Sequence, residues 1–223
     1  MLRLALATSL LALTAAAPVQ QDWSRTLTAT TNGWLIGNPR APRKLVEYLS
    51  LNCGHCAAVA HELGPDLRAA VRTGRTSWEV RPMGLFPHDV PATLLARCVP
   101  APRRLDFIEA YYRDVPGFTE RLQASQLSAA GVGALRQASE KGSGPLAIAM
   151  ADASGMKPIA ARFGLAGPAY ARCLSDPKAH AWFDGAIRAA RQAGVTGTPT
   201  FFVNGQRVTF SSMDELRAAI LAR

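Results

Sequence analysis

Short runs of apolar and β-branched residues, bounded by glycine, proline or asparagine, predict the strands of this protein. The segments concerned are residues 33–37, 44–50, 76–82, 200–203 and 207–210. The last two are separated by Asn204-Gly205, a pair that is typical of a tight hairpin turn. We therefore expect a sheet in which these two strands are neighbours.

Apolar residues at three- and four-residue spacing predict helices between these strands. One such stripe follows the strand at 44–50, and its members are Val59, Ala60, Leu63, Leu67, Ala70 and Val71. Gly64-Pro65 lies in the middle of this stripe and predicts a kink or a break. A second helix is expected to begin at Asp176-Pro177 and to end at Gly194, and a last helix is expected at about 213–221.

The region from 88 to 175 differs from its surroundings. Alanine, glycine and arginine dominate it, strand signals are missing, and glycine- and proline-rich segments at 142–145 and 164–168 divide it into several short helices. The order of elements therefore predicts an α/β fold with an all-helical insertion at 88–175. Residues 33–87 and 176–223 are expected to form the domain that carries the sheet.

The first 17 residues predict a secretory signal peptide. Arg3 is the only charged residue before Asp22, and a short apolar run ends at Ala15-Ala16-Ala17. Cleavage is expected near residue 17. Because Pro18 disfavours cleavage directly after Ala17, the exact site is left open within a few residues. An uncleaved anchor and a mitochondrial presequence are the alternatives, although the run is short for a bilayer span. The polar residues 18–32 are expected to form an N-terminal leader or loosely docked arm.

The composition is that of a globular protein with a basic surface. Of its 223 residues, 48% are hydrophobic and 18% are charged, and the formal net charge is +9. Such a charge is compatible with binding to nucleic acid or to an anionic membrane. The arginines are scattered, however, without a dense run or an interleaved aromatic platform. We therefore expect a solvated basic surface and no nucleic-acid partner.

The tetrapeptide Cys53-Gly54-His55-Cys56 is the main candidate for chemistry. It lies between an apolar strand and a helix, the context in which this cysteine spacing indicates redox activity. The alternative is half of a zinc site, which would need two further ligands at suitable spacing. The chain has no second such motif, and its other histidines and cysteines are dispersed. We therefore expect no metal and no cofactor.

Two separated motifs make the chain resemble the DsbA-like branch of the thioredoxin superfamily. The segments that carry the resemblance are 37–42, 45–51, 53–56 and 195–205. The resemblance covers about residues 33–87 and 176–222. It implies a thioredoxin fold, that is, a central mixed sheet flanked by helices, into which the helical segment is inserted. Two features depart from the oxidase of this branch: Gly54 stands where that oxidase has proline, and Thr198 is more like the isomerases.

The motif assigns roles to its cysteines. Cys53, at the N-terminus of a helix, is expected to be the nucleophile, because free N–H groups and the helix dipole favour its thiolate. His55 is expected to add a positive charge or a hydrogen bond to that thiolate. Cys56, one turn into the helix, is expected to be buried and to act as the resolving thiol.

The resemblance implies roles for three further positions. Glu47 is expected to be the family's buried acid, which accepts the proton of the resolving thiol; the alternative is a surface-facing residue on a half-exposed strand. Pro199 resembles the family's cis-proline, whose loop faces the two cysteines. Pro199, Thr198 and Gly54 are therefore expected to contact the substrate.

The four cysteines all lie after the predicted signal peptide, and an even number in an oxidising compartment suggests two disulfides. Related proteins with a second cysteine pair carry a structural disulfide there. The resemblance therefore implies a bridge between Cys98 and Cys173, and two buried free thiols are the alternative.

Together these observations predict an exported thiol–disulfide oxidoreductase of the periplasm, most simply a disulfide-donating oxidase. Its expected partners are cysteine-containing secreted proteins and a membrane redox partner, and a monomer is expected because residues 18–32 are too few for a dimerisation domain. A disulfide reductase or isomerase is the first alternative, favoured by Gly54 and Thr198. A non-enzymatic module that holds peptides or delivers copper is the second.

Overall fold

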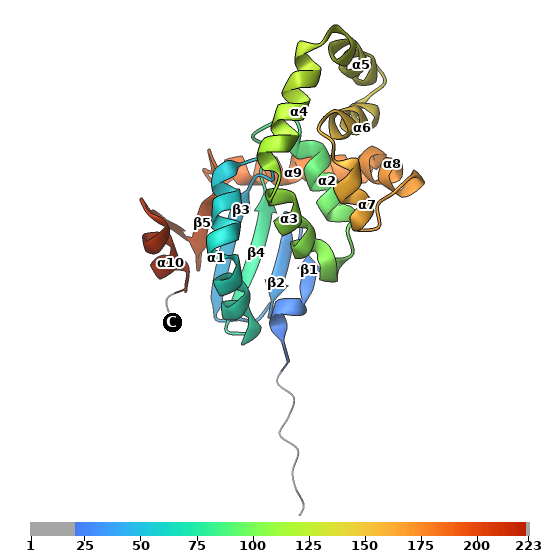
Figure 1. Cartoon of the computed structure of the whole chain (residues 1–223). Helices are drawn as coiled ribbons and strands as arrows, with labels where there is room; N and C mark the ends of the chain where they lie inside the picture. Colours follow the sequence, from blue (N-terminus) through green and yellow to red (C-terminus); the bar gives the residue numbers. More distant parts are fainter. Residues whose placement is uncertain (1–20, 222–223) are drawn as a thin grey trace, which may run out of the picture.

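The computed structural model describes residues 21–221, and the predicted signal peptide lies outside them. Within this part of the chain the strands form a six-stranded mixed sheet in the order β1-β2-β4-β3-β5-β6 (Figure 1). The central pair β3 and β4 is parallel, and the other neighbours are antiparallel. The strands are β1 (Leu27–Ala29), β2 (Trp34–Gly37), β3 (Arg43–Leu49), β4 (Thr76–Pro82), β5 (Thr200–Val203) and β6 (Gln206–Val208).

Residues 21–221 also form ten α-helices and two short 3-10 helices. The helices that pack on the sheet are α1 (Gly54–Arg72), α9 (Pro177–Gln192) and α10 (Met213–Leu221). The helices of the central segment are α2 (Asp89–Cys98), α3 (Arg104–Tyr112), α4 (Val115–Leu127), α5 (Ala129–Glu140), α6 (Ser143–Ala153), α7 (Lys157–Arg162) and α8 (Pro168–Ser175). The 3-10 helices are η1 (Trp23–Arg25) and η2 (Ala101–Arg103).

Alternating residues of the central strand β3 face two different layers. Leu45 and Leu49 belong to the main core, which also contains the buried residues of α1 and α10. Tyr48 points to the opposite face, where it packs in a smaller cluster with Ala190 of α9. The sheet is therefore covered on both faces, and the expected thioredoxin fold is confirmed.

The helical insertion is confirmed as well. Helices α2 to α8 follow β4 without an intervening strand and return the chain to α9 (Figure 1). In the figure, α4 and α5 project furthest from the sheet. Among residues 21–221, no helix combines the length and the apolar character that crossing a membrane would require.

The N-terminal arm is more ordered than its polar composition indicates. Leu27 pairs with Ile36, so that β1 extends the sheet beyond β2. The indole of Trp23 lies so close to Gly74 that a Cβ at this position would come within 2.6 Å of it. This glycine also has a φ of +77°, which disfavours other residues. The arm is therefore held by contacts that are distant in sequence.

Helix α1 is continuous, although a kink or a break was expected at Gly64-Pro65. Pro65 lies inside the helix, where it removes one backbone donor. Leu63 and Leu67, on either side of the proline, are fully buried in the main core. Burial of this face stabilises the helix across the missing hydrogen bond.

The sequence predictions for the start of α9 and for the turn between β5 and β6 agree with the structure. The side chain of Asp176 accepts a hydrogen bond from the backbone N–H of Lys178 and so caps α9. Asn204 and Gly205 both have positive φ, at 49° and 81°, as the turn between β5 and β6 requires. The return strand β6 ends at Val208, two residues earlier than expected.

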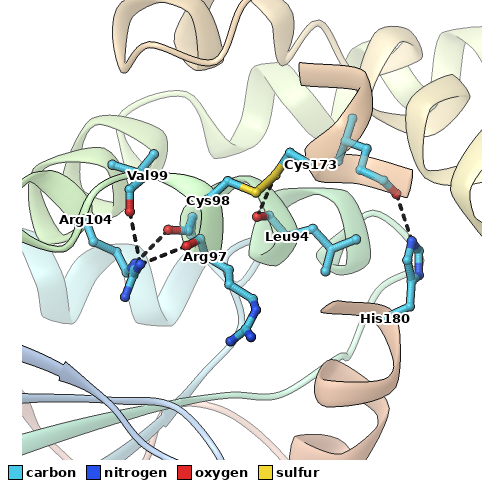
Figure 2. Close-up of a disulfide and its surroundings, with 9 residues drawn as sticks. Leu94, Arg97, Cys98, Val99, Arg104, Cys173 and His180 are labelled. Atoms are coloured by element: carbon cyan, nitrogen blue, oxygen red, sulfur yellow. Dashed lines mark hydrogen bonds between the residues drawn. A yellow bond between two sulfur atoms is a disulfide. The ribbon is translucent and has the colours of Figure 1, made fainter. Parts of the chain in front are cut away.

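A disulfide joins Cys98, the last residue of α2, to Cys173 of α8 (Figure 2). The two Cα atoms are 6.1 Å apart, a usual separation for this bond. Beside the bridge, the buried guanidinium of Arg104 donates hydrogen bonds to the carbonyls of Ala96, Arg97 and Val99. The C-terminal end of α2 is thus held both covalently and by a cation.

Candidate active site

Cys53 lies at the N-cap of α1, directly after the loop that follows β3. Its Sγ lies 3.3 Å from the carbonyl oxygen of Thr198, to which it donates a hydrogen bond only in its protonated form. A hydrogen bond from the thiol of Cys56 lowers the pKa of Cys53 to about 5, against the opposing effect of burial. The backbone N–H groups of Cys56 and His55 lower it further. Cys53 is therefore a thiolate at neutral pH.

Cys56 has the opposite properties. Its side chain is fully buried, and burial raises its pKa well above that of an ordinary thiol. The neighbouring Cys53 raises it further. At neutral pH, Cys56 therefore remains a protonated thiol that donates to the Cys53 thiolate. This division of protonation between two adjacent thiols suits one of them to attack and the other to resolve.

The two residues between the cysteines are exposed. A Cβ built on Gly54 would have no atom within 4 Å apart from its chain neighbours and the backbone of its own helix, so that a larger residue fits at this position. His55 acts on Cys53 through its backbone N–H. Its imidazole was expected to stabilise the Cys53 thiolate. In the structure this ring makes no hydrogen bond with another residue of the described chain.

The loop before β5 faces Cys53. The Thr198–Pro199 peptide bond is cis, and the Thr200 hydroxyl donates to the Gly197 carbonyl at 2.8 Å. The Thr198 hydroxyl is buried and has no hydrogen-bond partner of normal geometry within residues 21–221. It contributes to lowering the pKa of Cys53, so it is a donor that the thiolate can use.

Glu47 lies in β3 and faces the main core. Its side chain is buried and accepts a hydrogen bond of 2.9 Å from the indole N–H of Trp78. Burial raises the pKa of Glu47 to about 7, although the bond from Trp78 opposes this effect. Its charge also raises the pKa of Cys56. Glu47 can therefore give or take a proton near neutral pH, close to the resolving thiol.

The raised pKa of Glu47 predicts a pH-dependent stability. The folded state binds a proton more tightly than the unfolded state, so stability falls as pH rises from about 4.5 to about 7. The difference between these two values corresponds to about 3 kcal/mol. We expect the free energy of unfolding of Glu47→Gln, minus that of the wild type, to increase by about this amount between pH 4.5 and 8.

Urea denaturation at several pH values measures this difference. Glu140→Gln, at an exposed acid of α5, is the matched control and should follow the wild type throughout. A difference between Glu47→Gln and the wild type that does not change with pH would refute the prediction.

Four residues around the loop before Cys53 escaped the sequence analysis: Asn52, Asp89, Tyr111 and Tyr112. All four are buried, and hydrogen bonds connect them to each other or to Ser50. The polar residues Ser50 and Asn52 directly after an apolar strand were a signal that this loop is held by side-chain hydrogen bonds. Their partners lie too far along the chain for any spacing to indicate them.

Metal-binding side chains do not gather at this site. Within residues 21–221, no group of three or more histidines, cysteines, aspartates or glutamates has a geometry that could hold an ion. Cys53 and Cys56 are the free cysteines of this part of the chain.

Comparison with known proteins relates this geometry to a family. A sequence profile described as thioredoxin matches residues 29–222. No curated protein matches the chain. The structure is similar to that of a protein-disulfide isomerase from Novosphingobium aromaticivorans, with a TM-score of 0.73 and 28% sequence identity over 84% of this chain and 95% of that one.

Two further solved structures share the fold at lower identity. Alpha-DsbA1 from Wolbachia pipientis has a TM-score of 0.58 and 20% identity, and the alignment covers 81% of this chain and 79% of that protein. BdbD from Bacillus subtilis, in its oxidised form, has a TM-score of 0.58 and 15% identity, with 90% and 96% covered.

Proposed function

Because this chain belongs to the thioredoxin family, as a DsbA-like thiol–disulfide oxidoreductase, we propose that it donates disulfides to cysteine-containing proteins outside the cytoplasm. The observation that carries this proposal is the thiolate of Cys53 at the N-terminus of α1, beside a buried thiol and the Pro199 loop. A thiolate stabilised in this way favours the dithiol state, so the corresponding disulfide is an oxidant.

The proposed reaction transfers two electrons from client to enzyme. A client thiolate attacks the Cys53 sulfur of the Cys53–Cys56 disulfide, and Cys56 leaves as a thiolate that takes a proton from Glu47. A second client thiolate then attacks the client sulfur of the mixed disulfide and releases Cys53 as a thiolate. The client gains a disulfide and the enzyme becomes a dithiol, which an external oxidant must reoxidise.

The client is proposed to bind as an extended segment along the loop that faces Cys53. The backbone on either side of the cis-proline Pro199 would pair with such a segment, as in strand addition. Thr198 and Gly54 flank the Cys53 sulfur and would contact client residues next to the reacting cysteine. The exposed backbone at Gly54 leaves room for this approach.

The low pKa of Cys53 supports the oxidising direction. At pH 7, a pKa of about 5 favours the dithiol state about 100-fold over that of an ordinary thiol. Since a tenfold change corresponds to about 30 mV, the disulfide becomes more oxidising by about 60 mV. This pKa lies between the values of about 7 in thioredoxin and about 3.5 in DsbA.

Disulfide isomerisation or reduction is the second candidate function. Gly54 and Thr198 favour it, as does the similarity to a solved structure described as a protein-disulfide isomerase. An isomerase requires a membrane partner that keeps its cysteines reduced, whereas an oxidase requires one that reoxidises them. For either function we propose export to the periplasm, on the grounds of the N-terminal sequence.

The equilibrium between the reduced protein and glutathione buffers tests the direction. We expect a reduction potential on the oxidising side of about −200 mV, within the range of about −270 to −120 mV that related proteins span. A potential near that of thioredoxin, at about −270 mV, would contradict the oxidase and favour the reductase, whereas an isomerase overlaps the expected range at about −180 mV. Complementation of strains that lack either the oxidase or the isomerase pathway provides an independent answer.

A further inference from the structure

Asp89 is a buried carboxylate that the proposed chemistry does not use. It is the first residue of α2, and its side chain is fully buried. It forms none of the ion pairs within residues 21–221. A carboxylate without a cation is costly to bury unless hydrogen bonds compensate for the lost water. The surroundings of Asp89 provide such compensation.

Five donor groups point at the two oxygens of Asp89. Its Oδ1 accepts from the Ser50 hydroxyl at 2.8 Å, from the backbone N–H of Asn52 at 3.1 Å and from the Asn52 amide at 2.9 Å. Its Oδ2 accepts from the backbone N–H groups of Leu85 and Phe86 at 2.8 and 2.9 Å. Only an ionised carboxylate offers acceptors in all these directions without presenting a donor of its own.

This network ends one residue before the nucleophile. Asn52 directly precedes Cys53, and the backbone N–H of Cys53 donates to the Ser50 carbonyl at 3.3 Å. The same carbonyl accepts a hydrogen bond from the hydroxyl of Tyr112 at 3.1 Å. The turn that presents Cys53 is therefore held by Asp89 on one side and by α3 on the other.

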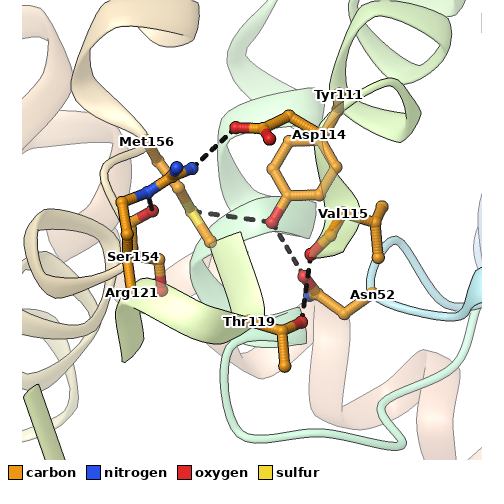
Figure 3. Close-up of polar contacts among 8 residues, drawn as sticks. All are labelled: Asn52, Tyr111, Asp114, Val115, Thr119, Arg121, Ser154 and Met156. Atoms are coloured by element: carbon orange, nitrogen blue, oxygen red, sulfur yellow. Dashed lines mark hydrogen bonds and ion pairs between the residues drawn. The ribbon is translucent and has the colours of Figure 1, made fainter. Parts of the chain in front are cut away.

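A second link connects the same turn to the helical insertion. Figure 3 shows the hydroxyl of Tyr111 directed at the side chain of Asn52, and the Tyr111 Oη to Asn52 Oδ1 distance is 2.9 Å. Asn52 thus donates to Asp89 and accepts from Tyr111. Asp89, Tyr111 and Tyr112 all belong to the insertion, whereas Cys53 belongs to the domain that carries the sheet.

We propose that Asp89 is a positioning residue, which acts through Ser50 and Asn52 to hold Cys53 at the N-terminus of α1 and against Thr198. The inference rests on the proposed role of Cys53 as the nucleophile. Without Asp89, the donors of Asn52, Leu85 and Phe86 lose their common acceptor, and the turn that carries Cys53 loosens. The helix N-terminus and the Thr198 loop then stabilise the thiolate less well.

The test compares Asp89→Asn, Asn52→Ala and the wild type. Asp106→Asn is the matched control, at a surface carboxylate in the first turn of α3 that pairs with Arg68. The rate of alkylation of the reduced full chain by iodoacetamide, measured against pH, reports the apparent pKa of Cys53, because Cys56 is fully buried and its pKa is raised. Thermal unfolding of each variant shows whether it is folded.

We expect Asp89→Asn to raise the apparent pKa of Cys53 by at least one unit and to shift the glutathione equilibrium about tenfold toward the disulfide. That shift corresponds to a potential about 30 mV more negative. Asn52→Ala should change both quantities in the same direction by a smaller amount, and Asp106→Asn should change neither.

A folded Asp89→Asn chain with the wild-type pKa at Cys53 would overturn the proposal and leave Asp89 a structural residue. A lowered pKa would also overturn it, because Asp89 would then act through its charge. If Asp89→Asn does not fold, a wild-type pKa in Asn52→Ala refutes the proposal. Alkylation needs no client. If the variants show these shifts but the wild type fails as an oxidase, the proposed function alone is refuted.

Discussion

Replacing Cys53 by alanine is expected to abolish disulfide exchange, with a loss of at least 1000-fold in the rate of client oxidation. The reason is that no other free thiol in the described chain is ionised at neutral pH. Cys56 is fully buried, and its pKa is raised. The two remaining cysteines, Cys98 and Cys173, are joined in a disulfide. The recovery of activity by a reduced, unfolded client protein measures this rate.

Cys56→Ala is the informative counterpart, because it keeps the nucleophile and removes the resolving thiol. The reduced variant should react with oxidised glutathione and remain as a mixed disulfide that mass spectrometry detects. The pH at which Cys53 is half-maximally alkylated should lie near 5 in the wild type and higher in Cys56→Ala, since the bond from Cys56 is the main cause of the low pKa.

For Cys53→Ala, residual activity above a tenth of wild type would refute the assignment of Cys53 as the nucleophile.

The second large effect concerns the disulfide between α2 and α8. It links residues that are 75 positions apart, and replacing both Cys98 and Cys173 by serine releases that loop in the unfolded chain. On the chain-entropy model, the free energy of unfolding should fall by about 4 kcal/mol. The active site lies on a different helix, so exchange activity at 25 °C should stay within about twofold of wild type. Urea denaturation of both oxidised proteins measures the difference.

A chain with Cys53→Ala and Cys56→Ala isolates this effect. Its remaining bridge is Cys98–Cys173, so any loss of stability on adding a reductant comes from that bond alone. The loss should equal that of the serine double variant. A change of less than about 1 kcal/mol in both experiments would show that the bridge contributes little beyond the contacts that surround it.

Local signals account for the parts of the structure that the sequence predicted well. Asp176 caps α9 by accepting a hydrogen bond from the backbone N–H of Lys178, two residues further on. Asn204-Gly205 forms the turn between two strands that directly adjoin it. In each case the interacting atoms are within a few residues of one another. The start of α1 directly after Cys53 was predicted in the same way, from the end of one strand and the beginning of one helix.

Contacts between distant residues account for what the sequence did not predict. The edge strand β1 exists because it pairs with β2, and α1 passes through Pro65 because its apolar face is buried on both sides. Asp89 is 37 positions from Asn52, and nothing near it in the chain indicates that its oxygens accept hydrogen bonds from the loop before Cys53. Predicting these features requires the fold itself.

The open space at Gly54 has a consequence for the history of this protein. Since a Cβ at this position would meet no atom within 4 Å apart from its chain neighbours and the backbone of its own helix, and since the first residue of a helix accepts proline, the residue here can change without disturbing the core. Substitution at this position can therefore alter the chemistry of the two cysteines at little cost to the packing of the core, so that one scaffold can be tuned toward oxidation or toward isomerisation.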